Sequence, residues 1–343
     1  MTGPSSARTW GKRLAMAAVA VLLLGGGYAA MNWAALKAGW AAKELGEAGT
    51  DEARTAAAAK LVALGEPGLP CIVELLQSDD APGCLAVVAA LRESWKDTPP
   101  TDPAFAAKCR LILAEAATYS DAGKDAILDL AADAVRCPDA DVAARGRDAI
   151  RAGLAATSPE AVARAAVFAA LPEVNLKADV VPLLADARAE VRRAAIRAVG
   201  PALRGVEPVI GDEELFRWLN DPDIEVQAVC EASLATRGMD SDQIAAARKL
   251  THPEATERLK LLLDLRWGRD TVRDPGPWLE RLSRDADPAV RAGAARVACE
   301  CQLTFAGWLD RLATDDPEGS VRDIAAYYRA KAAEVKQAGF EDR

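Results

Sequence analysis

The chain has 343 residues, of which 51% are hydrophobic and 5% are aromatic, and its formal net charge at pH 7 is −9. Abundant alanine and few aromatic side chains favour closely packed helices over β-sandwiches, so we expect an all-α fold. The first 40 residues carry a charge of +4, which leaves −13 for the remainder and argues against a nucleic-acid partner, because phosphate binding requires a basic surface.

The first predicted element is a membrane segment. Residues 1–13 form a basic region, and residues 14–36 carry no charge. A helix of these 23 residues, with a rise of about 1.5 Å per residue, would span a hydrocarbon core of about 30 Å, so we expect a transmembrane signal anchor. The basic flank predicts a single-pass protein with its body outside the cytoplasm, on the periplasmic side in a bacterium. The alternative is export after signal-peptide cleavage, because the dense apolar run Leu14–Leu24 is short and small residues follow it at Gly25–Ala30.

The rest of the chain divides into a tether at residues 37–55, a helical body at residues 56–335 and a polar tail at residues 336–343 that we expect to fray. Within the body, Lys96–Pro103 has the sequence KDTPPTDP and is predicted to be a loop, because it is rich in turn residues. The number of helical units in the front half stays open, since that part repeats less regularly.

The second half of the body contains internal repeats. Pro277–Val297 (PWLERLSRDADPAVRAGAARV) and Gly307–Tyr328 (GWLDRLATDDPEGSVRDIAAYY) are versions of one unit, and Phe216–Leu234 and Val180–Gly200 are further copies. Each copy contains a short apolar helix, an acidic turn and a second helix that begins near a valine. A repeat period of 30 to 35 residues is typical of stacked helical units.

The acidic turns predict helix starts. We expect Asp221, Asp287 and Asp316 to be N-caps, each followed by a proline at the first helical position, and Ser158 to cap in the same way. The residues four positions after the repeat valines are all small: Ala166, Ala195, Cys230, Ala294 and Ala325. Small side chains let helices approach closely, so this column is predicted to face the interior of the stack.

These units resemble the HEAT-repeat superfamily, most closely the short HEAT-like repeats of bacterial proteins. The resemblance implies an α-solenoid of stacked helical hairpins, of the armadillo-like kind, over about residues 56–335. It also implies a structural ladder in which an arginine after the repeat valine bonds to turn aspartates. The residues that match are Arg192, Arg291, Arg322, Asp221, Asp287 and Asp316, whereas Gln227 departs from the pattern.

The sequence offers little material for catalysis. Its one histidine, His252, precedes Pro253 in a turn, and the seven cysteines show no metal-binding spacing. No phosphate-binding loop is present, and the paired acids recur at turns, where caps are expected. We therefore expect no catalytic, cofactor-binding or metal-binding residues, and no enzyme activity.

The leading hypothesis is a membrane-tethered scaffold or adaptor that binds a protein or peptide partner. Arg197 and Arg296 lie five residues beyond the ladder arginines, on the second-helix surface, and are the predicted partner contacts. Trp218, Trp278 and Trp308 occupy matching places on the first helices, where packing is the expected role. The alternative is a HEAT-like enzyme, such as a chromophore lyase, that uses the solenoid groove.

Overall fold

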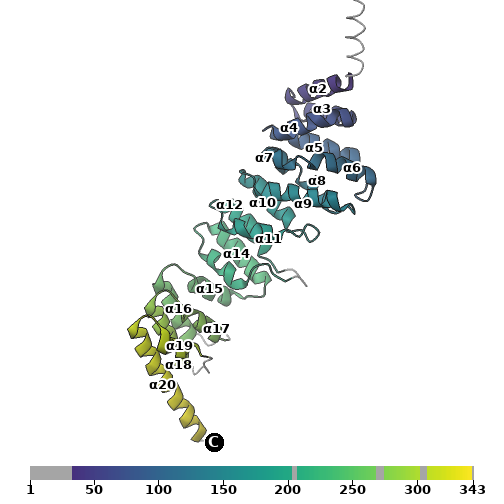
Figure 1. Ribbon diagram of the computed structural model, residues 1–343. Helices are drawn as coiled ribbons and strands as arrows, with labels where there is room; N and C mark the ends of the chain where they lie inside the picture. Colours follow the sequence, from purple (N-terminus) through teal and green to yellow (C-terminus); the bar gives the residue numbers. More distant parts are fainter. Residues whose placement is uncertain (1–32, 203–206, 268–273, 302–306, 342–343) are drawn as a thin grey trace, which may run out of the picture. The chain divides into compact units, whose positions relative to one another are not determined.

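The computed structural model describes residues 33–202, 207–267, 274–301 and 307–341, and in these ranges the chain is all α-helical, with no strand. The all-α prediction is therefore confirmed. The chain divides into two compact units, residues 1–179 and residues 180–343. Within each unit, helices that follow one another in the sequence lie side by side (Figure 1).

The first unit consists of short helices that pack on one another. Its helices are α2 (Trp33–Gly46), α3 (Asp51–Ala63), α4 (Leu69–Gln77), α5 (Ala81–Trp95), α6 (Pro103–Leu113), α7 (Asp121–Ala126), α8 (Leu128–Val135), α9 (Ala140–Leu154) and α10 (Pro159–Ala169), with 3₁₀ turns η1 (Glu66–Gly68) and η2 (Ala116–Thr118), and α11 (Lys177–Val180) at the boundary. Side chains cap these helices at their starts. Ser158 accepts a hydrogen bond from the Ala161 N–H, as predicted, and Asp80 accepts one from Gly83.

The second unit has a repeat-like pattern of a short helix, a turn and a longer helix. Its elements are η3 (Val181–Ala185), α12 (Ala189–Val199), α13 (Asp212–Leu215), η4 (Phe216–Asn220), α14 (Ile224–Thr236), α15 (Ser241–Leu250), α16 (Ala255–Trp267), α17 (Gly276–Leu282), α18 (Pro288–Glu300), α19 (Trp308–Asp315) and α20 (Gly319–Glu341). The longer helices pack on one another in order, α12 on α14, α16 on α18 and α18 on α20.

The predicted column of small residues lies in the core. Ala166, Ala195, Cys230, Ala294 and Ala325 all have 0% exposure, as do the valines one turn earlier. No space remains at these positions for a longer side chain, because the neighbouring helix lies directly against them. The repeat register derived from the sequence is therefore confirmed.

The segment expected to be a tether, residues 37–55, is instead largely helical. It contains most of α2, the short connection after Gly46 and the start of α3. Ala38, Ala41 and Leu45 lie on one side of α2 and are buried, because their spacing of three and four residues places them on one helical face. The polar tail also differs from the expectation, since α20 continues to Glu341. The predicted loop, by contrast, lies between α5 and α6.

The predicted anchor at residues 14–36 lies outside the described residues, apart from Trp33–Leu36, which begin α2. None of the helices in the described ranges combines the length and the apolar character needed to cross a membrane.

Ala294→Arg is expected to lower the free energy of unfolding by more than about 2 kcal/mol, because it places a long, charged side chain in a fully buried helix contact. The matched control is Ala330→Arg on the exposed side of α20, which should change stability by less than about 0.5 kcal/mol. Urea unfolding of both variants gives the comparison. Equal midpoints for the two variants would contradict the burial of Ala294.

Candidate functional site

Buried arginine–aspartate pairs connect successive helices of the second unit. In each pair, the Nε and Nη2 groups of an arginine donate to the two oxygens of one carboxylate, a bidentate geometry that is among the strongest available to these side chains. The pairs are Arg192–Asp221 (2.8 and 2.7 Å), Arg258–Asp285 (2.7 and 2.9 Å) and Arg291–Asp316 (2.7 and 2.9 Å).

The same arginines also hold their own turns. The Nη1 group of Arg291 donates to the carbonyl oxygens of Asp285 and Ala286, which lie six and five residues upstream. Arg192 and Arg258 make the equivalent bonds. Hydrogen bonding to Arg291 is the main reason that the pKa of Asp316 lies below its ordinary value, although burial opposes this shift. Each arginine therefore joins the turn of its own helical hairpin to the turn of the next hairpin.

The structure assigns the turn acids differently from the expectation. Asp287, Asp221 and Asp316 were each expected both to cap a helix and to join the ladder. Asp287 only caps α18, by accepting from Ala289 and Val290, and Asp285 two residues earlier receives the arginine. Asp221 and Asp316 are ladder residues and not N-caps, since Asp223 caps α14 and α20 begins at Gly319. The ladder acid lies five residues before the repeat valine and the cap lies three before it, so two acids at this spacing have separate roles.

Two positions of the ladder lack a charged pair. Gln227 stands where an arginine is expected, and its Nε2 group donates to the Asp221 carbonyl at 2.7 Å. In the register of the following unit, His252 occupies the place of the ladder acid, and its Nδ1 atom accepts from the Glu254 N–H at 3.1 Å. The expected turn role of His252 is thus confirmed. Arg322 donates through Nη1 to the carbonyls of Asp316 and Pro317, and no described carboxylate pairs with it.

The predicted partner-binding arginines are both exposed, on α12 and α18. Arg296 bonds to Glu300, one turn away on its own helix, at 3.0 Å. The structure shows no contact between Arg197 and Arg296. Of the three repeat tryptophans, Trp218 is buried and donates to the Leu184 carbonyl at 3.0 Å, which supports the expected packing role.

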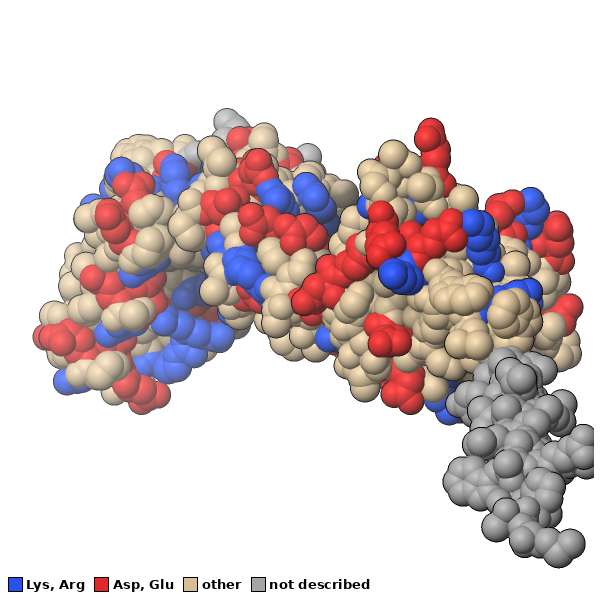
Figure 2. Space-filling view, turned by 90° about the horizontal axis from the view of Figure 1, so that it is seen from above, with Lys and Arg blue, Asp and Glu red and all other residues tan. Residues whose placement is uncertain are grey.

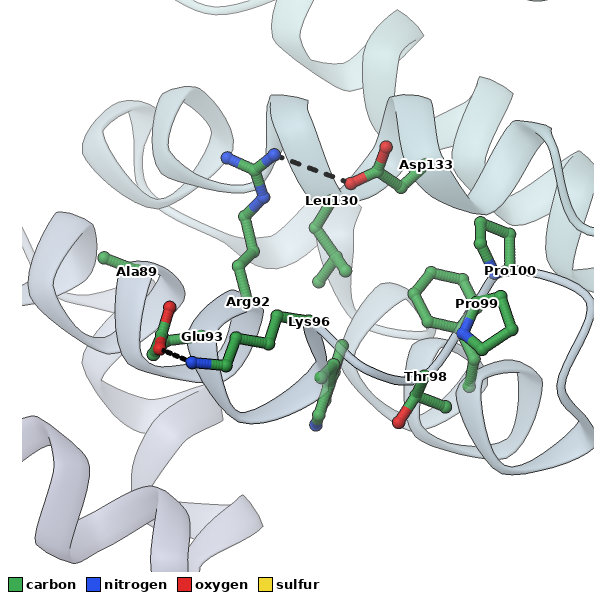
Figure 3. Close-up of a pocket in the computed structure, with 11 residues that line it drawn as sticks. Ala89, Arg92, Glu93, Lys96, Thr98, Pro99, Pro100, Leu130 and Asp133 are labelled. Carbon is green, nitrogen blue, oxygen red and sulfur yellow. Dashed lines mark hydrogen bonds and ion pairs between the residues drawn. The ribbon is translucent and has the colours of Figure 1, made fainter.

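A groove of about 500 Å³ opens on the first unit between α5, α6 and α8 (Figure 3). We call it the α5–α6 groove. Its apolar lining consists of Trp95, Pro99, Pro100, Phe105 and Leu130, and its charged rim of Arg92, Glu93, Lys96 and Asp133. Trp95 at the end of α5 meets Phe105 at the start of α6 edge to face, with ring centres 6.0 Å apart, so the proline-containing loop closes over a rigid aromatic base.

The rim of the groove contains one loosely held charge, Arg92, and a direct ion pair between Lys96 and Glu93. Figure 3 shows Arg92 directed towards Asp133 and Lys96 towards Glu93. The Arg92 guanidinium lies 3.8 Å from the Asp129 carboxylate and 3.7 Å from that of Asp133, which is beyond hydrogen-bond distance. Burial raises the pKa of Asp133 above its ordinary value, although the nearby arginines oppose this effect. Arg92 can therefore turn its donors to an incoming acceptor without breaking a hydrogen bond.

An acidic stripe lies behind the rim. It consists of aspartates at every fourth residue along α7 and α8: Asp121, Asp125, Asp129 and Asp133. Arg164 of α10 reaches Asp125 at 2.7 Å and Asp129 at 3.4 Å, whereas Arg92 approaches from α5. The stripe is thus bridged to α5 by Arg92 and to α10 by Arg164, and its last member, Asp133, lies at the rim of the groove.

A second groove of about 490 Å³ lies on the other side of Trp95, among α4, α5 and α6. Ile72, Leu91 and Leu111 contribute to its lining, and Leu111 is 51% exposed. The Lys108 ammonium lies 5.5 Å from the centre of the Trp95 ring. Trp95 therefore separates two cavities on one unit.

The groove was not identified from the sequence. The available signal was an aromatic residue on each side of the KDTPPTDP segment, Trp95 before it and Phe105 after it. Arg258 and Asp285 were also missed as a ladder pair, although they fit the spacing that places the acid five residues before the valine.

The described residues contain no group of three or more histidine, cysteine or acidic side chains that could hold a metal ion. On the face drawn in Figure 2, acidic side chains are interspersed with basic ones. Neither observation identifies a ligand.

No protein-family model matches the chain, and no curated protein matches it. Fifteen chains of solved structures match it, and one of them is a crystal structure of an engineered protein. That protein is 19% identical, the match covers 87% of this chain and 99% of the other, and the TM-score is 0.24. At this TM-score the likeness carries no argument about fold or function.

Asp316→Asn is expected to lower the free energy of unfolding by about 3 kcal/mol at pH 7, because it leaves the buried Arg291 without its counter-charge. The folded-state pKa of Asp316 lies below its ordinary value, so its ionic stabilisation is complete above about pH 4 and is lost as the pH falls through that lowered pKa. The difference in unfolding free energy between Asp316→Asn and wild type should therefore be smaller at acidic pH than at pH 7. Urea unfolding at pH 7 and pH 3 measures it.

Arg296→Gln serves as the matched control for this experiment. Its ion pair with Glu300 is half exposed, so removing it should change stability by less than about 1 kcal/mol at either pH. An Asp316→Asn effect as small as that of the control would argue against a buried pair.

The buried thiols are expected to resist alkylation in the folded protein. Burial raises the pKa of Cys84 to about 11 and those of Cys109 and Cys230 to about 12, and the thiolate is the reactive form. Iodoacetamide at pH 8 should label the half-buried Cys71 and Cys299 at least about tenfold faster than these three. Mass spectrometry of the peptides gives the rates, with guanidinium-unfolded protein as the control. Uniform rates in the folded state would contradict the packing described.

Proposed function

We propose that the protein is a non-catalytic scaffold or adaptor that binds a segment of a protein partner in the α5–α6 groove. The observation that carries this proposal is the combination of a buried aromatic base with the loosely paired Arg92 at the rim of one surface groove. Clefts with an apolar lining and a few placed polar groups are the usual sites for ligand side chains. Aromatic and arginine residues contribute most to binding free energy at such sites.

The shape of the groove favours a peptide side chain over a small reactive substrate. Trp95 and Phe105 are almost fully buried, so they provide a rigid floor that loses little entropy on binding. Pro99 and Pro100 restrict the loop that forms one wall. A partner segment that inserts an apolar side chain and presents a carboxylate to Arg92 would satisfy both parts of the groove.

We further propose that the two units are built from HEAT-like hairpins stacked as an α-solenoid. In the second unit, the ladder pairs and the fully buried column of small residues support this assignment, because they recur at the same place in several successive hairpins. In the first unit, the buried Ala166 fits the same column. In such arrays each repeat contacts its neighbours and the whole offers an extended binding surface.

Tethering to a membrane through residues 14–36, with the body outside the cytoplasm, is proposed from the sequence alone. The support is the uncharged stretch after a basic region. Export after cleavage is the alternative that fits the same residues. A nucleic-acid partner has little support, because the body of the chain is acidic.

An enzyme such as a chromophore lyase is the second candidate. The one observation in its favour is the raised pKa of Asp133 at the groove, since shifted carboxyl groups are common in active sites. Asp133 is, however, flanked by Arg92 and Arg136, and the other acid that lines the groove, Glu93, is bonded to Lys96. Partner binding therefore explains more of the features of the groove than an enzyme role does.

The partner is to be captured by a photoreactive residue at position 98, which lines the groove, in cells that produce a tagged full-length chain. The same residue at the exposed position 167 on α10 is the control. The double variant Arg92→Glu and Lys96→Glu should then lower affinity for the purified partner at least about tenfold, because it reverses the rim charge.

Arg197→Glu with Arg296→Glu tests the surface predicted from the sequence in the same assay. If only this variant loses affinity for the partner, the binding surface is assigned to the second unit. Unchanged affinity in both double variants would remove both surfaces from the proposal. Crosslinking at position 98 no stronger than at position 167 would argue against the groove itself.

A further inference from the structure

The last ladder helix of the second unit has an uncovered face. In α12, α16 and α18, the residues four and seven positions after the ladder arginine are buried beneath the next long helix or its neighbour. They are Ile196, Val199, Leu262, Leu265, Ala295 and Ala298, none more than 3% exposed. The equivalent residues of α20 are Ala326, which is half-buried, and Arg329, whose side chain is 47% exposed. No described helix covers this face of α20.

The arginine on this face is held in the orientation of the paired ladder arginines. Arg322 donates through Nη1 to the carbonyls of Asp316 and Pro317, at 2.6 and 3.3 Å. Arg291 makes the same two bonds to its own turn, at 2.8 and 3.0 Å. In Arg291, the Nε and Nη2 groups donate to the Asp316 carboxylate. In Arg322, the same two groups have no acceptor among the described residues.

We propose that the α20 end face, defined as Arg322, Ala326 and Arg329, docks an acidic helix-start turn from a helical hairpin of another polypeptide. Arg322 would take the aspartate of that turn in a bidentate pair. Ala326 is small, so it would let the incoming helix approach closely. This surface lies on the second unit, and the proposal does not depend on the α5–α6 groove.

Three other ladder arginines of this chain show which group binds the Nε and Nη2 donors. In each case the acceptor is an aspartate whose carboxylate also accepts the backbone N–H two residues later. These bonds run from Asp223 to Asp221 (2.9 Å), from Asp287 to Asp285 (2.8 Å) and from Glu318 to Asp316 (3.0 Å). The turn thus presents a carboxylate that is already oriented, which lowers the entropy lost on pairing.

The charge of the end face fits the same partner. Arg322 and Arg329 place two positive charges about two helical turns apart, and the only described acid whose side chain bonds to them is Asp310, at 3.4 Å from Arg329. A turn with one or two acids complements this face, whereas a basic or neutral turn would leave Arg322 partly buried with no carboxylate bonded to it.

The probe is a fluorescent peptide of residues 307–335, which contains the hairpin that Arg291 already binds. A lactam bridge between the exposed positions 320 and 324 holds its second helix, and circular dichroism verifies that it is helical before use. Fluorescence anisotropy measures its affinity for the full-length protein. A second peptide carries Asp316→Asn.

Arg322→Gln is the test variant, because Gln227 shows that a glutamine at this position still bonds to the carbonyl of its own turn. The fold is therefore kept while the bidentate donors are removed. We expect affinity for the peptide to fall at least about tenfold, and the Asn peptide to bind wild type about as weakly. The combination of both changes should cause little further loss. Arg284→Gln, at an exposed arginine paired with Glu280 next to α17, should leave affinity unchanged.

Three results would overturn the proposal. The first is equal affinity of the helical peptide for wild type and Arg322→Gln, and the second is no binding by the helical peptide at all. The third is self-association of the wild-type chain in sedimentation experiments that Arg322→Gln abolishes, which would assign the face to a second copy instead. Inorganic phosphate is titrated in parallel, and competition by phosphate without peptide binding would reduce the face to an anion site.

Discussion

The bidentate contact between an arginine and an aspartate of the next unit is the interaction on which the second half of the molecule depends. Arg192, Arg258 and Arg291 each bond to their own turn and to the following one, so a single side chain sets the position of two units. The net gain from such a buried pair is modest, because both groups lose hydration. Loss of one partner is much more costly, and this asymmetry disfavours any arrangement in which a unit is misplaced.

Arginine–aspartate pairs connect neighbouring helices in both halves of the chain, but the geometry of the pairs differs. In the first unit the charges are half exposed, and Arg92 and Arg164 bridge a row of aspartates on α7 and α8 instead of single carboxylates. Half-exposed pairs of this kind contribute little to stability. They leave charge at the rim of an aromatic groove, where it is available to a partner.

The sequence predicted the parts of the fold that depend on local spacing. The column through Ala195 and Ala294 and the cap at Ser158 follow from positions close together in the chain, and the structure agrees. The bond from Arg192 to a turn aspartate was implied by the resemblance to HEAT repeats. The distinction between Asp285 and Asp287 was not, because either aspartate suits a helix start and only the position of Arg258 separates them. The α5–α6 groove could not be predicted, since its lining comes from three segments that tertiary packing brings together.

The paired replacement at Gln227 and His252 limits how this array could have grown. An arginine in place of Gln227 would face no aspartate, and an aspartate in place of His252 would face no arginine, so the two neutral residues belong together across a unit boundary. Duplicating the hairpin with Asp285 and Arg291 would keep its junctions matched, whereas duplicating the hairpin with Asp221 and Gln227, or the one with His252 and Arg258, would bury an uncompensated charge. For those two hairpins, the residues that must match lie on either side of a junction and not within one hairpin.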